Sequence, residues 1–198
     1  VTVKAFLIPH IKKLAPEYEV TVVTNCSKKE FMDMGLPGNV RFKRIPFVRN
    51  PHLGYDAVCL AALCVFFWQN GFCIVHSFMP KTGLLTMTAA RLANIPLRIH
   101  TFTGQVWATR KGPVRWLLKT VDRFFASQAS FTLADSWSQR SFLLKERVIK
   151  PSKSTVLLNG SICGVNPHRF FPDKKMRASI RQAVFIAENH VVFLFLGR

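Results

Sequence analysis

The stretch IVHSFMPKTGLLTMTAARLANIPLRIHTFTG, residues 74–104, contains one complete strand-helix-strand unit. The two candidate strands of this unit, residues 73–77 and 97–101, are short apolar runs rich in β-branched residues. Residues 82–93 between them have the spacing of an amphipathic helix. A helix that connects two strands in this way carries the chain back so that the strands pair in parallel. The stretch therefore predicts a parallel sheet.

The same alternation continues on both sides of this unit. The candidate strands are residues 19–24, 40–45, 73–77, 97–101, 131–134 and 154–158. The candidate helices are residues 4–14, 57–69, 82–93, 113–127 and 136–146. We therefore expect an α/β fold, a Rossmann-like parallel sheet with helices on both faces.

A domain boundary is expected after residue 158, where NGSICGVNPHRFFPD is rich in Gly, Pro and Asn. Residues 1–158 form the first expected domain, and residues 159–173 form a connector. Residues 174–198 then supply a basic helix over residues 174–187 and a continuous apolar strand in HVVFLFLGR. Since a buried parallel strand needs neighbours, we expect this second domain to be truncated.

Composition limits the classes of partner and compartment. The chain has 28 Lys and Arg against 10 Asp and Glu, so its net charge of +18 favours anionic partners such as nucleic acid, acidic lipid or phosphorylated substrates. Five cysteines without a CxxC pair or metal-ligand spacing predict buried free thiols in a reducing compartment and no metal site. The longest apolar run, Val58 to Trp68, has about eleven residues against the roughly twenty of a membrane span, which predicts no transmembrane helix.

Two segments that follow predicted strands carry candidate chemistry, because ligands of open α/β sheets bind at the carboxyl ends of the strands. After residues 73–77 come Lys81, Thr82 and Gly83 at a helix start, where backbone N–H groups and a cation suit a phosphate or another anion. The alternative is that Thr82 is an N-cap and Lys81 a solvated charge.

After residues 97–101 comes HTFTGQVWATRKG, in which hydroxyls, an amide, an indole and two cations surround Gly104 and Gly112. This mixture suits a sugar or a diphosphate-linked ligand. The alternative is a basic surface loop with Trp107 packed against the core.

In the next helix Arg115, Lys119 and Arg123 recur every four residues and form a basic stripe. Such a helix can lie on anionic lipid, so we predict that these three residues form a membrane or anion surface. The alternative is an ordinary solvated face opposite a core-packed face. Asp135 and Ser136, ahead of WSQRSFLLKE, are explained by helix capping.

The order of motifs in residues 74–104 resembles glycosyltransferase family 4, the group 1 retaining enzymes. The match is a His, a Pro-Lys-small-Gly helix start, Ala-Arg-Leu-Ala-x-x-Pro and Thr-x-x-Gly. LADSWSQRSFL resembles the Ser-containing helix start of that family, and LLNGSICGVNPHRFFPD resembles its connector. VVFLFLGR resembles the strand and Gly-Arg that open its donor-binding domain. The motif TFTGQVW is similar to the corresponding sequence of the subgroup that acts on lipid-linked intermediates of surface polysaccharide.

This resemblance implies the amino-terminal half of a GT-B glycosyltransferase, whose active site lies between two Rossmann-like domains. It implies transfer of a hexose or N-acetylhexosamine from a nucleotide-diphosphate sugar to a polyprenyl-diphosphate-linked saccharide, with retention of configuration and without a metal or other cofactor. The residues expected to contact the acceptor substrate are Lys81, His100, Thr103, Gly104 and Gln105, and Arg198 is expected to contact the donor diphosphate.

The sequence departs from the family in ways that affect catalysis. Many members have a His where this chain has Thr103, and His100 is the nearest imidazole, so no catalytic residue is assigned. The Glu-x7-Glu donor motif is absent, and we expect the chain to be inactive alone. Its place would be cytoplasmic, peripheral on the inner face of the cytoplasmic membrane that holds the lipid acceptor.

Two other functions remain open at this point. A sugar-nucleotide epimerase of the same two-domain fold begins with a similar half. A basic nucleic-acid-binding module would explain the charge, but the cations are scattered, and no zinc site, RNA-binding aromatic motif or basic arm is present.

Overall fold

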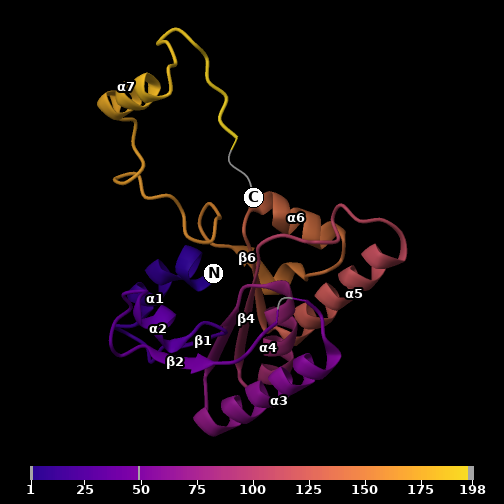
Figure 1. Cartoon of the computed structure of the whole chain (residues 1–198). Coiled ribbons are helices and arrows are strands. Elements are labelled where there is room, and N and C mark those ends of the chain that lie inside the picture. The colour runs from indigo at the N-terminus through magenta and orange to yellow at the C-terminus, as the bar shows by residue number, and fades with distance from the viewer. Residues whose placement is uncertain (1, 49, 196–198) are drawn as a thin grey trace. The chain divides into compact units, whose positions relative to one another are not determined.

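A computed structural model describes residues 2–48 and 50–195 (Figure 1). The chain divides into two compact units, Val1–Cys163 and Gly164–Arg198. The elements of the first unit are η1 Val3–Leu7, α1 Ile8–Leu14, β1 Thr21–Thr24, α2 Lys28–Met32, β2 Arg41–Arg44, α3 Leu53–Asn70, β3 Ile74–Ser77, α4 Pro80–Leu92, β4 Leu97–Phe102, α5 Gly112–Gln128, β5 Phe131–Ala134, α6 Trp137–Lys145, η2 Pro151–Lys153 and β6 Ser154–Val156. The second unit contains α7 Lys174–Ala183. The six strands predicted in residues 1–158 form, and so do the predicted helices, with ends that differ by a few residues.

Two parallel sheets make up the first unit. β1 pairs with β2, and the other four strands pair in the order β3-β4-β5-β6. Val22 of β1 faces a cluster with Ile11 of α1 and Phe31 of α2, whereas Val23 packs against the core that contains α3. Helices therefore cover both faces of the β1-β2 pair. The predicted α/β Rossmann-like fold is confirmed, although the strands form two hydrogen-bonded sheets.

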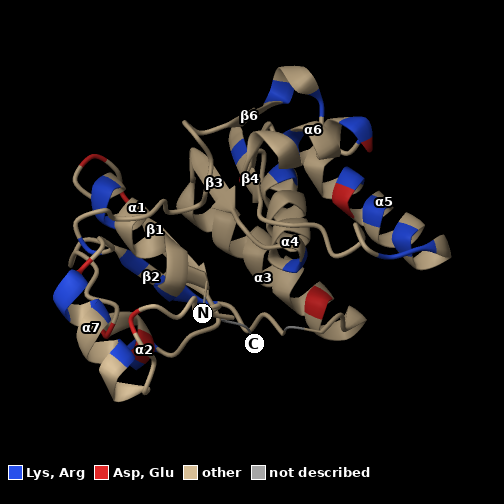
Figure 2. Ribbon diagram, turned by 90° about the horizontal axis from the view of Figure 1, so that it is seen from above, with Lys and Arg blue, Asp and Glu red and all other residues tan. Residues whose placement is uncertain are grey.

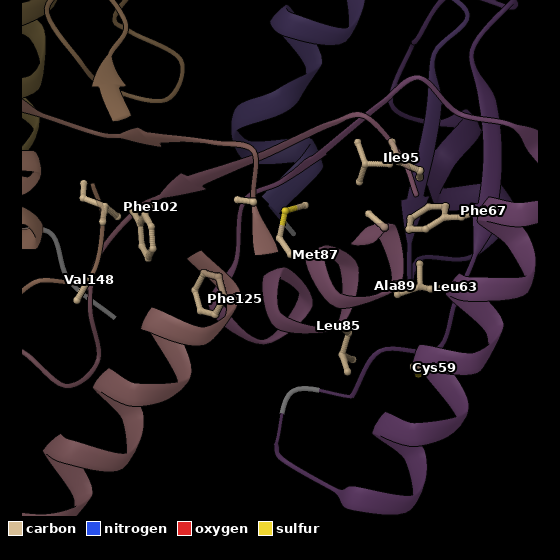
Figure 3. Packing of buried hydrophobic residues seen from close by; sticks show 14 of the residues in the cluster. Cys59, Leu63, Phe67, Leu85, Met87, Ala89, Ile95, Phe102, Phe125 and Val148 are labelled. Carbon is tan, nitrogen blue, oxygen red and sulfur yellow. The ribbon is translucent and has the colours of Figure 1, made fainter. Parts of the chain in front are cut away.

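One large core joins α3, α4 and α5 to both sheets (Figure 3). Its members include Cys59, Leu63, Phe67, Leu85, Met87, Ala89, Ile95, Phe102, Phe125 and Val148. Two of the five thiols, Cys59 and Cys64, are buried as predicted, whereas Cys73 and Cys163 are exposed. Small residues in α4 allow it to lie between α3 and α5, with which it makes most of its helix contacts.

α4 lies close to the sheet at Gly83. A Cβ atom on Gly83 would lie 2.6 Å from Cε1 of His100 in β4. The His100 ring is 1% exposed, its Nδ1 lies 2.8 Å from Oγ of Ser77, and its edges meet the rings of Phe102 and Phe125. Glycine is required at this position because the imidazole fills the space that a side chain would need.

The loop after β4 is held by Trp107, which is 1% exposed. Its Nε1–H donates to Oδ2 of Asp122 in α5 at 2.7 Å, and its ring stacks on Phe142 of α6. Of the two interpretations of this loop, the packing of Trp107 against the core is confirmed. The indole ties the loop to two helices at once.

Two short elements differ from the predictions. α2 was not predicted, and it begins with a capping box in which Ser27 and Glu30 exchange side-chain and backbone hydrogen bonds. The predicted strand near the end of the chain was wrong for residues 191–195, which have no strand structure. A strand needs a hydrogen-bonded neighbour, and Phe193 and Phe195 are more than 90% exposed.

The second unit is organised around Arg181 of α7. Its guanidinium donates to the carbonyl oxygens of Ala187, Glu188 and His190, which folds the following segment back onto the helix. Asp173 caps the start of α7 by accepting from the N–H of Met176 at 3.0 Å. The two compact units divide at residue 163, and the domain boundaries predicted from sequence stay predictions.

α3 is longer than the apolar run recognised in the sequence. It spans 18 residues with a mean hydropathy of 1.3, so its length and composition would allow it to cross a membrane. Only 22% of that helix is buried, but Cys59, Leu63 and Phe67 belong to the domain core. The helix is therefore an integral part of the α/β unit.

Gly83→Ala is expected to lower the free energy of unfolding by roughly 1–3 kcal/mol, because the new methyl group would overlap the His100 ring. Urea unfolding followed by circular dichroism measures the change. Gly54→Ala in α3 is the matched control, since the nearest atom to its Cβ is 3.7 Å away. The control should be unchanged or up to about 1 kcal/mol more stable. Equal losses in both variants would contradict the close approach.

Asp122→Asn is expected to become more stable relative to the parent chain as pH rises. Burial raises the pKa of Asp122 from 3.8 to about 6, although the bond from Trp107 opposes this rise. The folded protein therefore binds more protons than the unfolded chain between these values, so the stability contributed by this carboxyl falls as pH rises through them. The amide keeps an acceptor for the indole and carries no charge.

Urea unfolding of the parent and Asp122→Asn proteins at pH values of about 4 and about 7 measures this difference, which should grow by at most roughly 3 kcal/mol. Asp122→Ala is the control, because it leaves the Trp107 N–H buried without an acceptor and should be less stable than Asp122→Asn at both pH values. A difference between parent and Asp122→Asn that does not change with pH would refute the raised pKa.

Candidate functional site

The carboxyl ends of β3, β4, β5 and β6 lie along one edge of the four-stranded sheet (Figure 1). Polar side chains gather where these strands end. They are His76 on β3, Thr101 on β4 and Asp135 directly after β5. Because ligands of open α/β sheets bind at this edge, it is the candidate functional site.

His76 is the most accessible of these groups. Its Nε2 lies 2.8 Å from Oγ1 of Thr101, and its ring centroid is 4.1 Å from that of Phe78. The side chain remains open to solvent, yet the surrounding protein lowers its pKa to about 4 by desolvation and, second, by the charge of His10. His76 is therefore neutral at physiological pH and can donate or accept a hydrogen bond without carrying charge.

His10 reaches this edge from α1. Its Nε2 is hydrogen-bonded to the carbonyl oxygen of Ile162, in the segment after β6. Neither His10 nor His76 was predicted from the sequence to be a site residue. Their distance in the sequence hides the fact that both imidazoles come to one edge of the sheet, although the position of His76 at the end of a predicted strand was a usable signal.

The loop after β4 contains three of the predicted acceptor-contact residues. Gly104 has φ of +144°, a backbone conformation that favours glycine. Thr103 before it is half-buried. The side-chain nitrogen of Gln105 is buried and has no hydrogen-bond partner among residues 2–48 and 50–195. Leaving such a donor unpaired costs roughly 1–3 kcal/mol, which sets this amide apart from the paired polar groups of the interior.

Asp135 closes the other side of the edge. Its backbone N–H donates to the side chain of Gln139 at 2.7 Å, and its carbonyl accepts from Ser161 at 2.6 Å. Gly160 lies so close that a Cβ there would be 2.4 Å from the same carbonyl oxygen. Within the described part of the chain, the carboxylate atom Oδ1 of Asp135 is buried without a partner. Ser136 is the helix cap, as predicted, but capping does not account for this carboxylate.

Lys81 is held inside the unit. Its ammonium lies 2.7 Å from a carboxylate oxygen of Asp56 and donates to the carbonyl oxygens of Val48, at 2.8 Å, and of Asn50. Burial opposes ionisation of Asp56, but the bond from Lys81 keeps the pKa of this carboxyl below its ordinary value. Both earlier interpretations of this segment need correction. The Lys81 ammonium is paired within the protein, so it is neither a solvated charge nor free to bind an anion. The N-cap residue of α4 is Met79 and not Thr82.

His100 is also placed in the interior. It is 1% exposed, and burial lowers its pKa to about 3, so it is neutral. Its contacts with Ser77, Gly83 and Phe125 are those of a packing residue. The ring offers no surface to an acceptor substrate, which corrects the expectation that it contacts one.

The basic stripe of α5 is half-buried and lies against α6. Arg115 and Lys119 both form ion pairs with Glu146, the first at 2.9 Å, and both lie over the ring of Trp107. Arg123 donates to the carbonyl oxygens of Glu146 and Arg147 at the end of α6. Their charges are thus paired between α5 and α6, and the membrane or anion surface assigned to these cations stays a prediction.

The two remaining expectations concern donor binding and metal binding. Arg198, the expected donor contact, lies outside the described residues. In the described ranges 2–48 and 50–195, no three His, Cys, Asp or Glu side chains come together as metal ligands would. The absence of a metal or cofactor requirement stays a prediction.

Known proteins similar in sequence support one family. A family model described as "Glycosyl transferase 4-like domain" matches residues 11–160. The chain is 26% identical over 188 residues to the Escherichia coli UDP-Gal:alpha-D-GlcNAc-diphosphoundecaprenol alpha-1,3-galactosyltransferase. This match covers 94% of the chain and 48% of the relative. It is 30% identical over 126 residues to the Staphylococcus aureus capsular polysaccharide biosynthesis glycosyltransferase CapM. This second match covers 64% of the chain and 33% of the relative. The chain thus matches half or less of the length of these relatives.

A solved structure supports the same fold. Anabaena Alr3699/HepE, determined in complex with UDP, superposes with a TM-score of 0.64 at 14% identity, over 93% of this chain and 47% of that chain. At this identity the likeness shows the fold alone. The family model, in contrast, covers well over half of this chain, and the resemblance to family 4 enzymes is confirmed. The chain belongs to the glycosyl transferase 4-like domain family.

Proposed function

We propose that this chain forms the acceptor-binding side of a retaining glycosyltransferase of surface polysaccharide synthesis. The enzyme would move a hexose or N-acetylhexosamine from a nucleotide-diphosphate sugar to a polyprenyl-diphosphate-linked saccharide. The observation that carries this proposal is family membership together with the names of the two relatives, one of which specifies a diphosphoundecaprenol-linked acceptor and the other a capsular polysaccharide.

The carboxyl edge of the four-stranded sheet suits a saccharide acceptor. Sugars are bound by hydrogen bonds to their hydroxyls and by packing of ring faces on aromatic side chains. Gln105 offers an unpaired N–H, Asp135 an unpaired carboxylate oxygen, and Phe78 a ring beside the neutral His76. Thr103 adds a hydroxyl next to the glycine that shapes the loop. These groups would orient an acceptor hydroxyl toward the sugar being transferred.

Catalysis in this proposal rests on positioning and electrostatics. Departure of the nucleotide diphosphate leaves positive charge on the sugar ring and negative charge on the phosphates, so fixed dipoles and cations lower the barrier. No nucleophile is assigned on this chain. The donor diphosphate would be bound by a second domain, with Arg198 among its contacts and without a metal.

The location follows from the acceptor. A polyprenyl-diphosphate lipid stays in a bilayer, so the protein would work as a peripheral protein on the inner face of the cytoplasmic membrane. The net charge of +18 favours such a surface when its lipids are acidic. Both relatives are named glycosyltransferases, and we therefore retain neither the epimerase nor the nucleic-acid-binding alternative.

Gln105→Leu is expected to weaken acceptor binding by about tenfold without loss of stability. The variant removes a donor that is unpaired in the protein alone, so unfolding should be unchanged or shifted toward greater stability. Binding is measured by titration with a short-chain diphosphate-linked N-acetylglucosamine in detergent, and stability by urea unfolding.

Gln139→Leu is the matched control for this experiment. Its amide oxygen accepts from the backbone of Asp135 at 2.7 Å, so its loss should reduce stability by about 1 kcal/mol. If Gln105→Leu bound the acceptor as tightly as the parent chain, Gln105 would not be an acceptor contact.

The 198-residue chain is expected to bind this acceptor analogue yet transfer no sugar to it from a nucleotide-diphosphate sugar. The physical reason is that the proposal places the donor diphosphate contacts in a second domain. Chromatography of the saccharide product measures transfer, and the complete E. coli galactosyltransferase relative serves as the positive control. Product formed by the 198-residue chain alone would disprove this division of roles.

A further inference from the structure

α3 is apolar all round yet lies largely at the surface. It contains no Lys or Arg and one acidic residue, Asp56, and its ribbon is tan apart from one red band (Figure 2). Its buried side is the stripe Cys59, Leu63, Cys64 and Phe67. A helix with no polar face is normally buried in a protein core or in lipid. Here only 22% of the helix is buried inside the protein.

The outer side of α3 is a continuous apolar face. Val58, Ala61, Ala62 and Val65 are all exposed and recur at helical spacing. Tyr55 and Trp68 flank this face and are 56% and 62% exposed. Aromatic side chains with one polar atom are favoured at the boundary between lipid and water. The composition of this face therefore matches the interfacial region of a bilayer better than it matches water.

Cations border the same face. Lys43 and Arg44 of β2 line a groove of about 510 Å³ together with Val58, Ala62 and Val65. Both cations are exposed, and Nζ of Lys43 lies 5.1 Å from the ring centroid of Phe66. Among the described strands β2 pairs with β1 alone, and basic residues there would also discourage strand-to-strand association. Beside an apolar helix face, however, they supply the charge that attracts anionic lipid headgroups.

We infer that the outer face of α3, with Lys43 and Arg44, is the surface by which this protein lies on an anionic lipid bilayer. This inference rests on the proposed function only in that a lipid-linked acceptor requires access to a membrane. Val58, Ala61, Ala62 and Val65 enter the interfacial region, and the two cations meet lipid phosphates. α3 thus replaces the α5 stripe, whose cations are used within the protein, as the lipid-binding surface.

Sedimentation with vesicles of equal parts phosphatidylcholine and phosphatidylglycerol tests this surface on the full 198-residue chain. Val58→Glu/Val65→Glu should reduce vesicle binding at least about tenfold, because two charges would have to enter the lipid interface. Lys43→Gln/Arg44→Gln should reduce it by roughly tenfold at low salt and by less at high salt. Circular dichroism shows whether each variant is folded, and all four positions lie at the surface.

Val114→Glu/Leu117→Glu on α5 is the matched control. These side chains are 54% and 56% exposed, so the substitution adds the same charge at similar exposure on another helix of the same unit. We expect it to bind vesicles like the parent chain. Loss of binding in this control with retention in the α3 variant would move the surface to α5 and overturn the inference.

Two further outcomes would also overturn it. One is a parent chain that does not sediment with anionic vesicles. The other is a parent dimer in analytical ultracentrifugation that Val58→Glu/Val65→Glu converts to monomer while vesicle binding persists, which would show that a second copy covers α3. These vesicles contain no saccharide acceptor, so the result is independent of the acceptor-binding assay in detergent. A folded α3 variant should still bind the acceptor analogue as the parent does.

Discussion

The contact between Gly83 and His100 sets the distance between α4 and the four-stranded sheet, and much of the unit depends on it. The imidazole occupies the space beside the glycine, accepts or donates one hydrogen bond with Ser77, and meets the ring of Phe125 edge-on. Because Ser77 ends β3 and His100 lies near the end of β4, their bond also joins the two strands at the edge that forms the candidate site. Burial keeps the ring neutral, which makes an otherwise costly polar group compatible with the core.

Elements that depend on local pattern could be predicted from the sequence. Short apolar runs separated by amphipathic segments predicted the strands and the long helices, since side-chain period reports directly on which face is buried. α2 was overlooked because it is only five residues long, although SKKE at residues 27–30 is the pattern of the capping box that starts it. The strand expected in HVVFLFLGR does not form in residues 191–195. A strand requires a hydrogen-bonded partner strand, and an apolar composition does not show whether one is present.

The site was harder to predict because its charges are neutralised by distant residues. The spacing of Arg115, Lys119 and Arg123 correctly placed them on one face of a helix, but spacing does not show which face is outward. Glu146 and the carbonyl groups at the end of α6 supply their partners. Lys81 likewise finds Asp56 and two loop carbonyls. This chain has many more cations than carboxylates. The cations that pair with carboxylates stabilise contacts inside the protein, and the unpaired cations determine the positive electrostatic potential at its surface.

The buried polar groups of the first unit differ in whether they have a hydrogen-bond partner. Buried polar atoms are normally paired, and the Trp107-Asp122 and Ser77-His100 pairs follow this rule in the interior, where no ligand can reach. Gln105 and Asp135, which follow adjacent strands at the carboxyl edge, do not. The hydroxyl of Thr88 in α4 is also without a partner in the described chain, and nothing in the structure explains it. Since β4 and β5 are neighbouring parallel strands, Gln105 in the loop after β4 and Asp135 directly after β5 both lie at the carboxyl edge. In the proposed function these two groups would orient an acceptor hydroxyl, and their placement by the sheet would keep the entropic cost low.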